Sequence, residues 1–287
     1  MLGGKTNRMP QNHPLTLEQT VALTREIELL LEYGVSLSQQ HTGTPATYIE
    51  QQSSIVFAKC LMSLIGFVRF VPPSKYWAKE AIEVVDLSTA SVMARQFIED
   101  AVVFFYFNER GLSDEELRLR QNIWLFHGLV EAGEAAKLAD PEALVSTLTP
   151  DTLVIRENIE NDPLFVALGK DKEGKEAQGR IKKGRQPLLL SHKEILRRRS
   201  ISPRAYLFPL KAFSNFVHHS SISARFIDES ESNWRTCFHQ FIQVLYYVAA
   251  YTAEVSVCFL EGTSEAGNPP SEISELCAEY PKLLRGD

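Results

Sequence analysis

Apolar side chains recur through most of the chain at intervals of three and four residues, the spacing of one buried face of an α-helix. In the first such segment Leu23, Ile27, Leu30 and Leu31 follow Thr16-Leu17-Glu18-Gln19, a capping box that opens a helix. Further helices are predicted to begin at or near Thr44-Pro45, Asp86, Ser113, Thr149-Pro150, Ser191, Ser202-Pro203 and Glu231. No Asn-Gly or Asp-Gly turn separates two alternating runs, so strands are not predicted. The pattern therefore predicts an all-α protein, folded as a single antiparallel helical bundle.

Prolines set the expected ends of several helices. Pro72-Pro73 must end the second helix, and the shorter helix from Thr149-Pro150 is expected to close before Pro163. Pro209 falls within the helix that Ser202-Pro203 opens, so we expect a late start or a kink there.

One helical bundle domain is expected over residues 16–262, between two tails. Residues 1–15 are polar and are predicted to form a flexible N-terminal tail. Residues 263–287 are acidic and contain proline and serine, and this C-terminal tail has room for one short helix. Within the bundle, residues 170–186 carry many lysines and glycines and are predicted to form an exposed basic loop.

The charge of the chain is unevenly distributed. Residues 170–204 hold 12 basic and 4 acidic side chains, a net charge of +8, whereas the rest of the chain holds 18 basic and 32 acidic side chains. Such a density of positive charge attracts phosphate backbones, so Lys170–Arg204 is a candidate contact for RNA or DNA. The segment contains no interleaved aromatic residues, which single-strand stacking platforms use. A solvated loop neutralised by the acidic body explains the same pattern equally well.

Two apolar runs have nearly the length of a membrane span, Ile55–Val71 and Phe241–Leu260. Each contains charge, with Lys59 in the first and Glu254 in the second, so buried core helices are expected and no membrane contact. The polar N-terminus lacks the apolar stretch of a secretory signal. The 4 cysteines form no CxxC pair, which fits a reducing compartment, and a cytoplasmic location is predicted.

Two pairs of polar residues share a helix face at i, i+4 spacing. Arg95 and Glu99 lie on the face that also carries Tyr106, either as a surface ion pair or as part of a polar pocket sunk into the bundle. Ser214 and His218 form the second pair, which suits a histidine at a helix end satisfied by a hydroxyl. A Ser/His nucleophile is disfavoured, because the chain has no GxSxG elbow.

Arg120 and His127 are the third candidate pair, seven residues and about 10 Å apart along one helix face. An arginine can hold phosphate oxygens and a histidine can move a proton, which would suit phosphodiester cleavage. The alternative is a solvated arc of an amphipathic helix.

No metal site is expected, since HExxH and Glu-x-x-His are absent, and no cofactor is expected, since neither a Walker loop nor GxGxxG occurs.

The order of these motifs resembles a widespread group of bacterial helical proteins of unknown function. The resemblance covers 87–221 and rests on these pieces: Arg95-x-x-x-Glu99, Asn161-Asp162-Pro163-x-Phe165, the lysine-rich segment, Ser191-His192-Lys193-Glu194, and Tyr206 followed by Phe213-Ser214-x-x-Val217-His218. It implies that Arg95, Glu99, Ser214 and His218 meet in one inter-helical pocket.

The chain is also similar in style to the HEPN class, helical domains that include ribonucleases of toxin and antiphage systems. The mark of those ribonucleases is an arginine, a polar residue and, a few residues later, a histidine. Arg120, Gln121 and His127 match it loosely, with Gln121 where the class usually has Asn or Asp.

Three functions follow as hypotheses. The first is a cytosolic helical binding module with a polar inter-helical pocket, whose basic segment contacts nucleic acid. The second is a HEPN-like, metal-independent ribonuclease in which Arg120 and His127 act on the scissile phosphate. The third is a structural module whose basic segment docks an acidic protein surface. A homo-oligomer is a further partner prediction.

Overall fold

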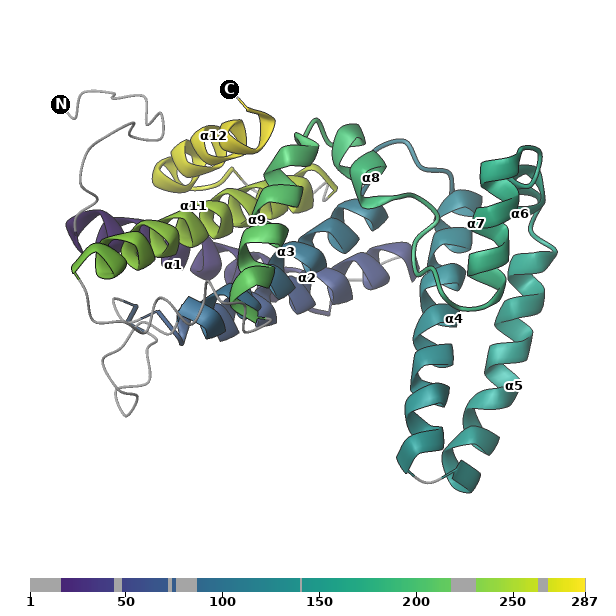
Figure 1. Cartoon of the computed structure of the whole chain (residues 1–287). Coiled ribbons are helices and arrows are strands. Elements are labelled where there is room, and N and C mark those ends of the chain that lie inside the picture. Colours follow the sequence, from purple (N-terminus) through teal and green to yellow (C-terminus); the bar gives the residue numbers. More distant parts are fainter. Residues whose placement is uncertain are drawn as a thin grey trace. The chain divides into compact units, whose positions relative to one another are not determined.

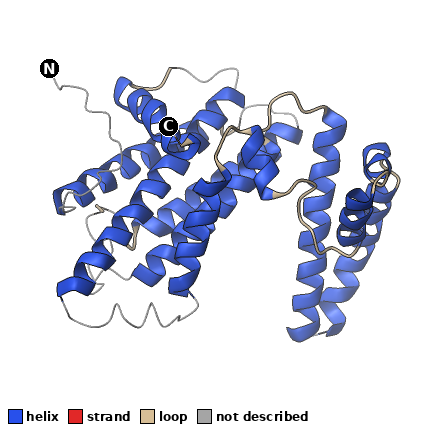
Figure 2. Cartoon of the chain, turned by 45° about the horizontal axis from the view of Figure 1, so that its top comes forward, coloured by secondary structure: helices blue, strands red, loops and turns tan. Residues whose placement is uncertain are grey.

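The computed structural model describes residues 17–43, 48–71, 74–75, 87–139, 141–217, 231–262 and 268–286. Within these residues the secondary structure consists of helices and turns without a strand, which confirms the all-α prediction (Figure 2). The chain divides into two compact units, so the expected single bundle is not confirmed. The first unit draws on Met1–Thr42, Phe57–Ala101 and Ser202–Asp287, and the second on Gly43–Val56 and Val102–Ile201.

Among the described residues, the first unit contains four whole helices, α1 (Leu17–Gln40), α9 (Pro203–Val217), α11 (Glu231–Gly262) and α12 (Ser271–Arg285) (Figure 1). It also contains the larger parts of α2 (Tyr48–Val68) and α3 (Leu87–Phe107), whose remaining residues, up to Val56 in α2 and from Val102 in α3, belong to the second unit. Helix α11 packs against α1 and α12. Gly34 lets α1 approach α2, because a Cβ atom there would lie 2.7 Å from the Leu61 side chain. The Phe57 ring of α2 stacks on Phe259 of α11 with 4.0 Å between centroids. These contacts place one shared apolar core between α1, α2 and α11.

In the part of the chain that the structure describes, two stretches are long and apolar enough to cross a membrane, Glu50–Val68 in α2 and His239–Gly262 in α11. The α11 stretch is 78% buried inside the protein and the α2 stretch 39%. The Glu254 side chain of α11 is fully buried and lies 3.0 Å from the Arg285 guanidinium of α12. Helix α11 is therefore a core helix, as expected, with a buried carboxylate held by a cation.

The second unit contains α4 (Asp114–Ala139), α5 (Pro141–Glu160), α6 (Pro163–Leu168), α7 (Lys172–Lys182) and α8 (His192–Arg198). Helices α4 and α5 lie side by side, and α6 packs on both (Figure 1). Their core combines buried side chains from four helices: Leu119, Ile123 and Phe126 from α4, Ile159 from α5, Phe165 from α6 and Ile181 from α7. Helices α6 and α7 thus cover one end of the α4–α5 pair.

The exposed basic loop predicted over residues 170–186 is wrong, because most of it is α7. The Asp171 carboxylate caps this helix by accepting a 2.7 Å hydrogen bond from the backbone N–H of Gly174. Glu173 in the first turn and Lys182 in the last complement the helix dipole. Ile181 is fully buried, so α7 is held by its own cap and by one deep core contact.

One predicted helix start is wrong. Helix α5 begins at Pro141 and runs through positions 149 and 150, where a shorter helix was expected to start. Helix α9 begins at Pro203, as Ser202-Pro203 predicts, and continues through Pro209, so of the two alternatives at Pro209 the late start is wrong. Pro209 leaves the Ala205 carbonyl without its usual helical donor, and the Tyr251 hydroxyl donates to that carbonyl at 3.5 Å.

The other expected helices are found close to their predicted bounds. The C-terminal helix, α12, is longer than the short one expected. The predictions for residues 1–15, Thr16, Thr44-Pro45, Pro72-Pro73 and Asp86 lie outside the described residues.

Candidate functional site

Lysines line the exposed face of α7 and of its C-cap residue. At 100° per residue, Lys172, Lys175 and Lys182 of α7 and the following Lys183 fall within an arc of about 100°, opposite the buried Ile181. All four are exposed, and Glu176 lies at the edge of the arc. None of the four lysines has an ion-pair partner among the described residues. Helix α7 therefore presents a concentrated positive face to solvent, and we call these four residues the lysine face.

The three consecutive arginines of the same basic segment, Arg197, Arg198 and Arg199, are engaged within the protein. Arg197 lies 3.3 Å from a carboxylate oxygen of Glu194, and Arg198 lies 2.8 Å from Glu109. The Arg199 guanidinium sits 5.9 Å from the centre of the Phe105 ring. Among the described residues, the exposed charge of this segment that no carboxylate pairs is therefore carried mainly by lysines.

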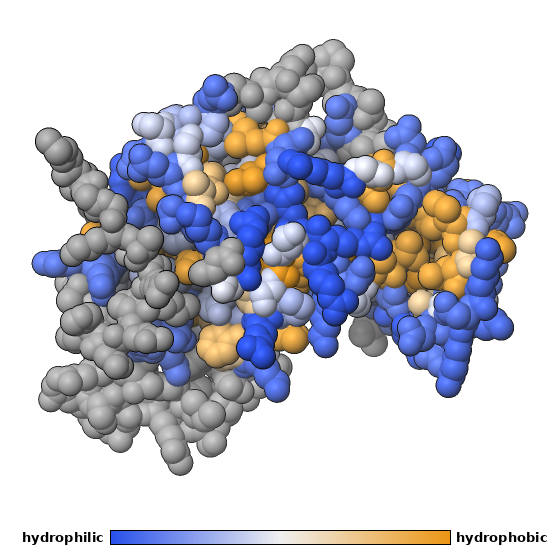
Figure 3. All heavy atoms as spheres, turned by 90° about the horizontal axis from the view of Figure 1, so that it is seen from above, coloured by the Kyte–Doolittle hydropathy of each residue, from blue (hydrophilic) through white to orange (hydrophobic). Residues whose placement is uncertain are grey.

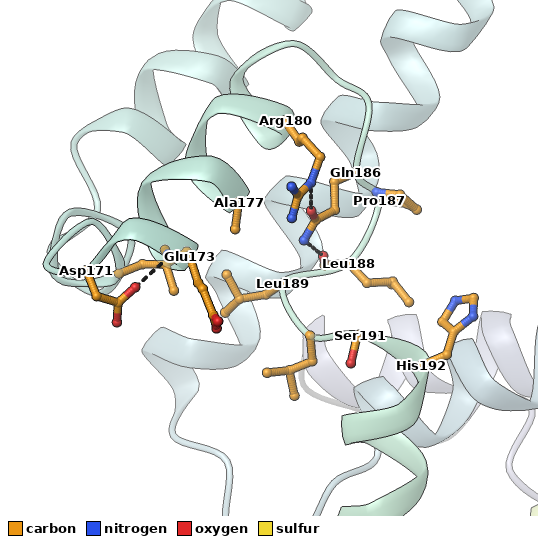
Figure 4. A pocket seen from close by; sticks show the side chains of 13 residues that line it. Asp171, Glu173, Ala177, Arg180, Gln186, Pro187, Leu188, Leu189, Ser191 and His192 are labelled. Atoms are coloured by element: carbon orange, nitrogen blue, oxygen red, sulfur yellow. Dashed lines mark hydrogen bonds between the residues drawn. The ribbon is translucent and has the colours of Figure 1, made fainter. Parts of the chain in front are cut away.

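A hollow of about 510 Å³ lies between α7 and residues 186–192 (Figure 4). Its walls are largely apolar, with Ala177 on the helix and the leucines 188–190 on the facing segment. The Arg180 side chain reaches across it, and its Nε atom donates to the Gln186 amide oxygen at 2.8 Å. Gln186 in turn donates to the Leu188 carbonyl at 2.7 Å, so the arginine and the facing segment are held together.

Tyr106 holds the segment that faces α7, residues 186–192, in place. The Tyr106 hydroxyl accepts a 2.9 Å hydrogen bond from the backbone N–H of Leu189. Burial raises the pKa of Tyr106 well above its ordinary value, so its hydroxyl is neutral across the physiological range. The wall of the hollow therefore rests on a fixed, buried group.

Arg120 lies in a buried ionic network next to this anchor. Its side chain is fully buried, and its guanidinium contacts Glu109 and Glu116, each at 2.6 Å, and the Tyr106 carbonyl at 2.5 Å. Burial by itself raises the pKa of Glu109, but hydrogen bonds from Arg120 and Arg198 outweigh it and lower that pKa below its ordinary value. Arg120 is therefore not part of a solvated helix face. Its guanidinium N–H groups donate to carboxylates and a carbonyl of the protein, so they are not directed at a phosphate ligand.

His127 and Gln121 occupy different surroundings on the same helix. The Nδ1–H of His127 donates to the Gly184 carbonyl at 2.5 Å and so fixes the end of α7. Gly184 has a φ of +64°, and a Cβ atom there would lie 2.7 Å from Val130, so both backbone conformation and space require glycine. Gln121 is buried, and neither its amide oxygen nor its amide nitrogen has a hydrogen-bond partner among the described residues.

Three of the four residues expected to share an inter-helical pocket do come together. The Arg95 Nε lies 2.9 Å from a Glu99 carboxylate oxygen, and its Nη1 donates to the Ser214 hydroxyl at 2.8 Å. This cluster joins α3 to α9, and each charged side chain is about one third exposed, at 34% and 36%. Burial raises the pKa of the neighbouring Tyr206, with a further contribution from the charge of Glu99. His218 lies outside the described residues.

Sequence reasoning missed the hollow and its anchor. Its polar residues come from two segments that no motif links, and Tyr106 stands within an apolar helix end that gives no sign of a hydrogen-bonding role. The Ser191 capping motif marked one boundary of the hollow, because Ser191 both caps α8 and lines the cavity. Among the described residues, no three His, Cys, Asp or Glu side chains gather in a geometry that could hold a metal ion.

Comparison of the chain with protein-family models, with curated proteins and with solved structures found no match. The resemblance to helical proteins of the HEPN type therefore stays a prediction from the motifs. The features of the structure that bear on function are the lysine face, the hollow beside it and the ionic clusters around Arg120 and Arg95.

Proposed function

We propose that the chain is a cytosolic helical module that binds nucleic acid through the phosphate backbone. The observation that carries the proposal is the lysine face of α7. Exposed lysines without ion-pair partners bind phosphates favourably, because each phosphate that they neutralise releases condensed counterions. The buried Ile181 side chain and the hydrogen bond from His127 to the Gly184 carbonyl hold α7, which keeps the face in position.

Gly179 supports this proposal. It lies on the same arc as the lysines, and a Cβ atom built on it would meet nothing within 4 Å. A glycine inside a helix costs about 1 kcal/mol of helix stability relative to alanine. Since there is room for a side chain, packing within the protein does not explain why this position is a glycine. Because Gly179 has no side chain, a nucleic-acid strand can approach the backbone of the helix closely at this point.

Docking of an acidic protein is the second candidate. Leu164 and Val166 on α6 are exposed, at 42% and 59% of their surface. The end of the second unit that carries α6 and α7 shows hydrophobic and hydrophilic side chains side by side (Figure 3). A mixed apolar and basic surface of this kind suits an acidic partner with an apolar anchor.

The test is a titration of labelled RNA and DNA, followed by fluorescence anisotropy at about 50 mM and about 200 mM salt. The variant Lys172→Gln/Lys175→Gln/Lys183→Gln should weaken binding and reduce the salt slope by about one for each phosphate that the protein no longer neutralises. The control is Arg118→Gln/Lys137→Gln/Lys282→Gln, which removes the same charge from exposed sites elsewhere.

Binding that weakens with salt in the wild type, and that is reduced more strongly in the first variant than in the control, supports the proposal. Undetectable binding at low salt would overturn it. So would equal reductions in the two variants, because that result would assign the affinity to net charge alone. A captured acidic protein that survives nuclease treatment, together with no oligonucleotide affinity, would favour the second candidate.

A further inference from the structure

The hollow beside α7 and the lysine face occupy adjacent sides of one helix. Arg180 lies about 60° around α7 from Lys183 in one direction and from Ala177, which lines the hollow, in the other. A ligand that rests its charged part on Lys183 can therefore place an attached group in the hollow without leaving the helix.

The chemistry of the hollow differs from that of the lysine face. Leucine, proline and alanine side chains form much of its wall, and its volume of about 510 Å³ is that of a site for a small organic group. Asp171 and Glu173 lie at one end of it (Figure 4). These carboxylates repel a phosphate, so the hollow favours a neutral ring. The phosphates of the ligand would then lie against the lysine face.

Polar groups in the hollow match the edge of a heterocyclic ring. The Nε of Arg180 is used by Gln186, which leaves the terminal nitrogens of its guanidinium to donate to ring or carbonyl acceptors. The Ser191 hydroxyl oxygen accepts from the Glu194 backbone N–H at 3.3 Å, so its O–H proton can donate elsewhere. The Glu173 carboxylate can accept from an exocyclic amine. Donors and an acceptor are thus arranged around an apolar space, as recognition of a nucleobase requires.

We propose that this hollow receives one unstacked nucleobase from a single strand whose phosphates lie on the lysine face. This inference rests on the proposed nucleic-acid function and specifies its substrate class as single-stranded. A duplex can still bind the lysines, but its bases are paired and stacked and reach the hollow only after being flipped out. Single strands should therefore bind more tightly than duplexes of the same charge.

The first experiment uses the wild-type protein and three ligands: a single strand, a duplex with the same number of phosphates, and a strand of the same length whose residues are abasic. All three carry phosphates, but only the single strand offers free bases. We expect the single strand to bind about tenfold more tightly than the abasic strand at matched salt, which is roughly the effect of one additional buried hydrogen bond.

The second experiment fills the hollow with Ala177→Trp and uses Ala167→Trp, at an exposed position of α6, as the matched control. Ala177→Trp should lower single-strand affinity toward that of the abasic strand and leave duplex affinity unchanged. Ala167→Trp should leave both unchanged. Circular dichroism of each variant checks that the helices are retained.

The outcomes separate this inference from the function on which it rests. Equal wild-type affinity for normal and abasic strands, with weaker binding only in the lysine variant, would overturn the base pocket and keep phosphate binding. No binding of any strand at low salt would overturn both. The abasic comparison needs no variant, so a folding defect in Ala177→Trp leaves the inference open to refutation.

Discussion

The Tyr106 hydroxyl holds the backbone N–H of Leu189 at 2.9 Å, although the two residues are 83 positions apart in the sequence. Tyr106 lies at the end of helix α3 and is fully buried, whereas Leu189 lines the hollow beside α7. One hydrogen bond thus connects the buried core of the second unit to the wall of its candidate binding site. The backbone carbonyl of the same tyrosine accepts a hydrogen bond from Arg120, so Tyr106 contacts both the buried ionic network and the wall of the hollow.

Tyr106→Phe removes this hydrogen bond and leaves the Leu189 N–H without its acceptor. We expect the free energy of unfolding to fall by roughly 1 to 3 kcal/mol and the Leu189 amide to exchange with solvent faster. Urea denaturation and amide hydrogen exchange measure the two effects. Tyr247→Phe is the control, because the Tyr247 hydroxyl has no hydrogen-bond partner among the described residues. Equal protection of Leu189 in wild type and Tyr106→Phe would contradict the anchoring role.

Arg120→Met removes the cation from a buried network and leaves Glu109 and Glu116 without it. The loss of one partner of a buried ion pair costs roughly 3 to 5 kcal/mol, because the remaining charges are poorly solvated. In Arg120→Met, Glu109 keeps its contact with Arg198, whereas Glu116 loses its cation. The double variant Arg120→Met/Glu116→Gln should therefore be more stable than the single variant, since it also removes the unpaired carboxylate. Urea denaturation compares the two. A double variant that is less stable than Arg120→Met would show that Glu116 has another stabilising partner.

Glu109 should make the second unit sensitive to acid. Its pKa is lower in the folded protein than the ordinary value of 4.5, so the unfolded chain binds this proton at higher pH than the folded chain does. The resulting stability is fully present above about pH 4.5 and is lost as the pH falls through the folded pKa. Unfolding free energies measured from about pH 7 to about pH 3 should fall less steeply for Glu109→Gln than for wild type. Parallel curves would contradict this assignment.

Two glycines of α7 should respond in opposite ways to alanine. A Cβ atom on Gly174 would lie 1.7 Å from the Leu168 carbonyl oxygen, so Gly174→Ala must displace backbone and should cost roughly 1 to 3 kcal/mol. Gly179→Ala meets open space and should stabilise the helix by about 1 kcal/mol. Thermal unfolding followed by circular dichroism measures both changes. Destabilisation by Gly179→Ala would mean that this position has a packing role in the folded protein.

The helix starts that the sequence predicted well are those with local caps. Ser113 accepts from the Glu116 backbone N–H at 3.2 Å, and Ser191 accepts from that of Glu194, as their capping motifs imply. A cap is formed by residues three positions apart, so the chain around it needs no distant contact to specify the helix. Helix α7 was missed because it offers one deeply buried apolar side chain, Ile181, among lysines and glycines. Its stability depends on packing against α4 and α6, which periodicity does not report.

The sequence by itself determined the all-α class, the concentration of positive charge and the Arg95–Glu99 pair, because each depends on composition or on neighbours within one helical turn. Tertiary structure alone decided which charges face solvent and which are paired within the protein. It buried Arg120 against carboxylates, brought Ser214 to Arg95 from 119 positions away, and left the α7 lysines in solvent. It also formed the hollow, whose walls meet only because the second unit packs α7 over α6 and ties Leu189 to Tyr106. Burial and long-range contact are properties of the packed chain, so no local pattern of residues encodes them.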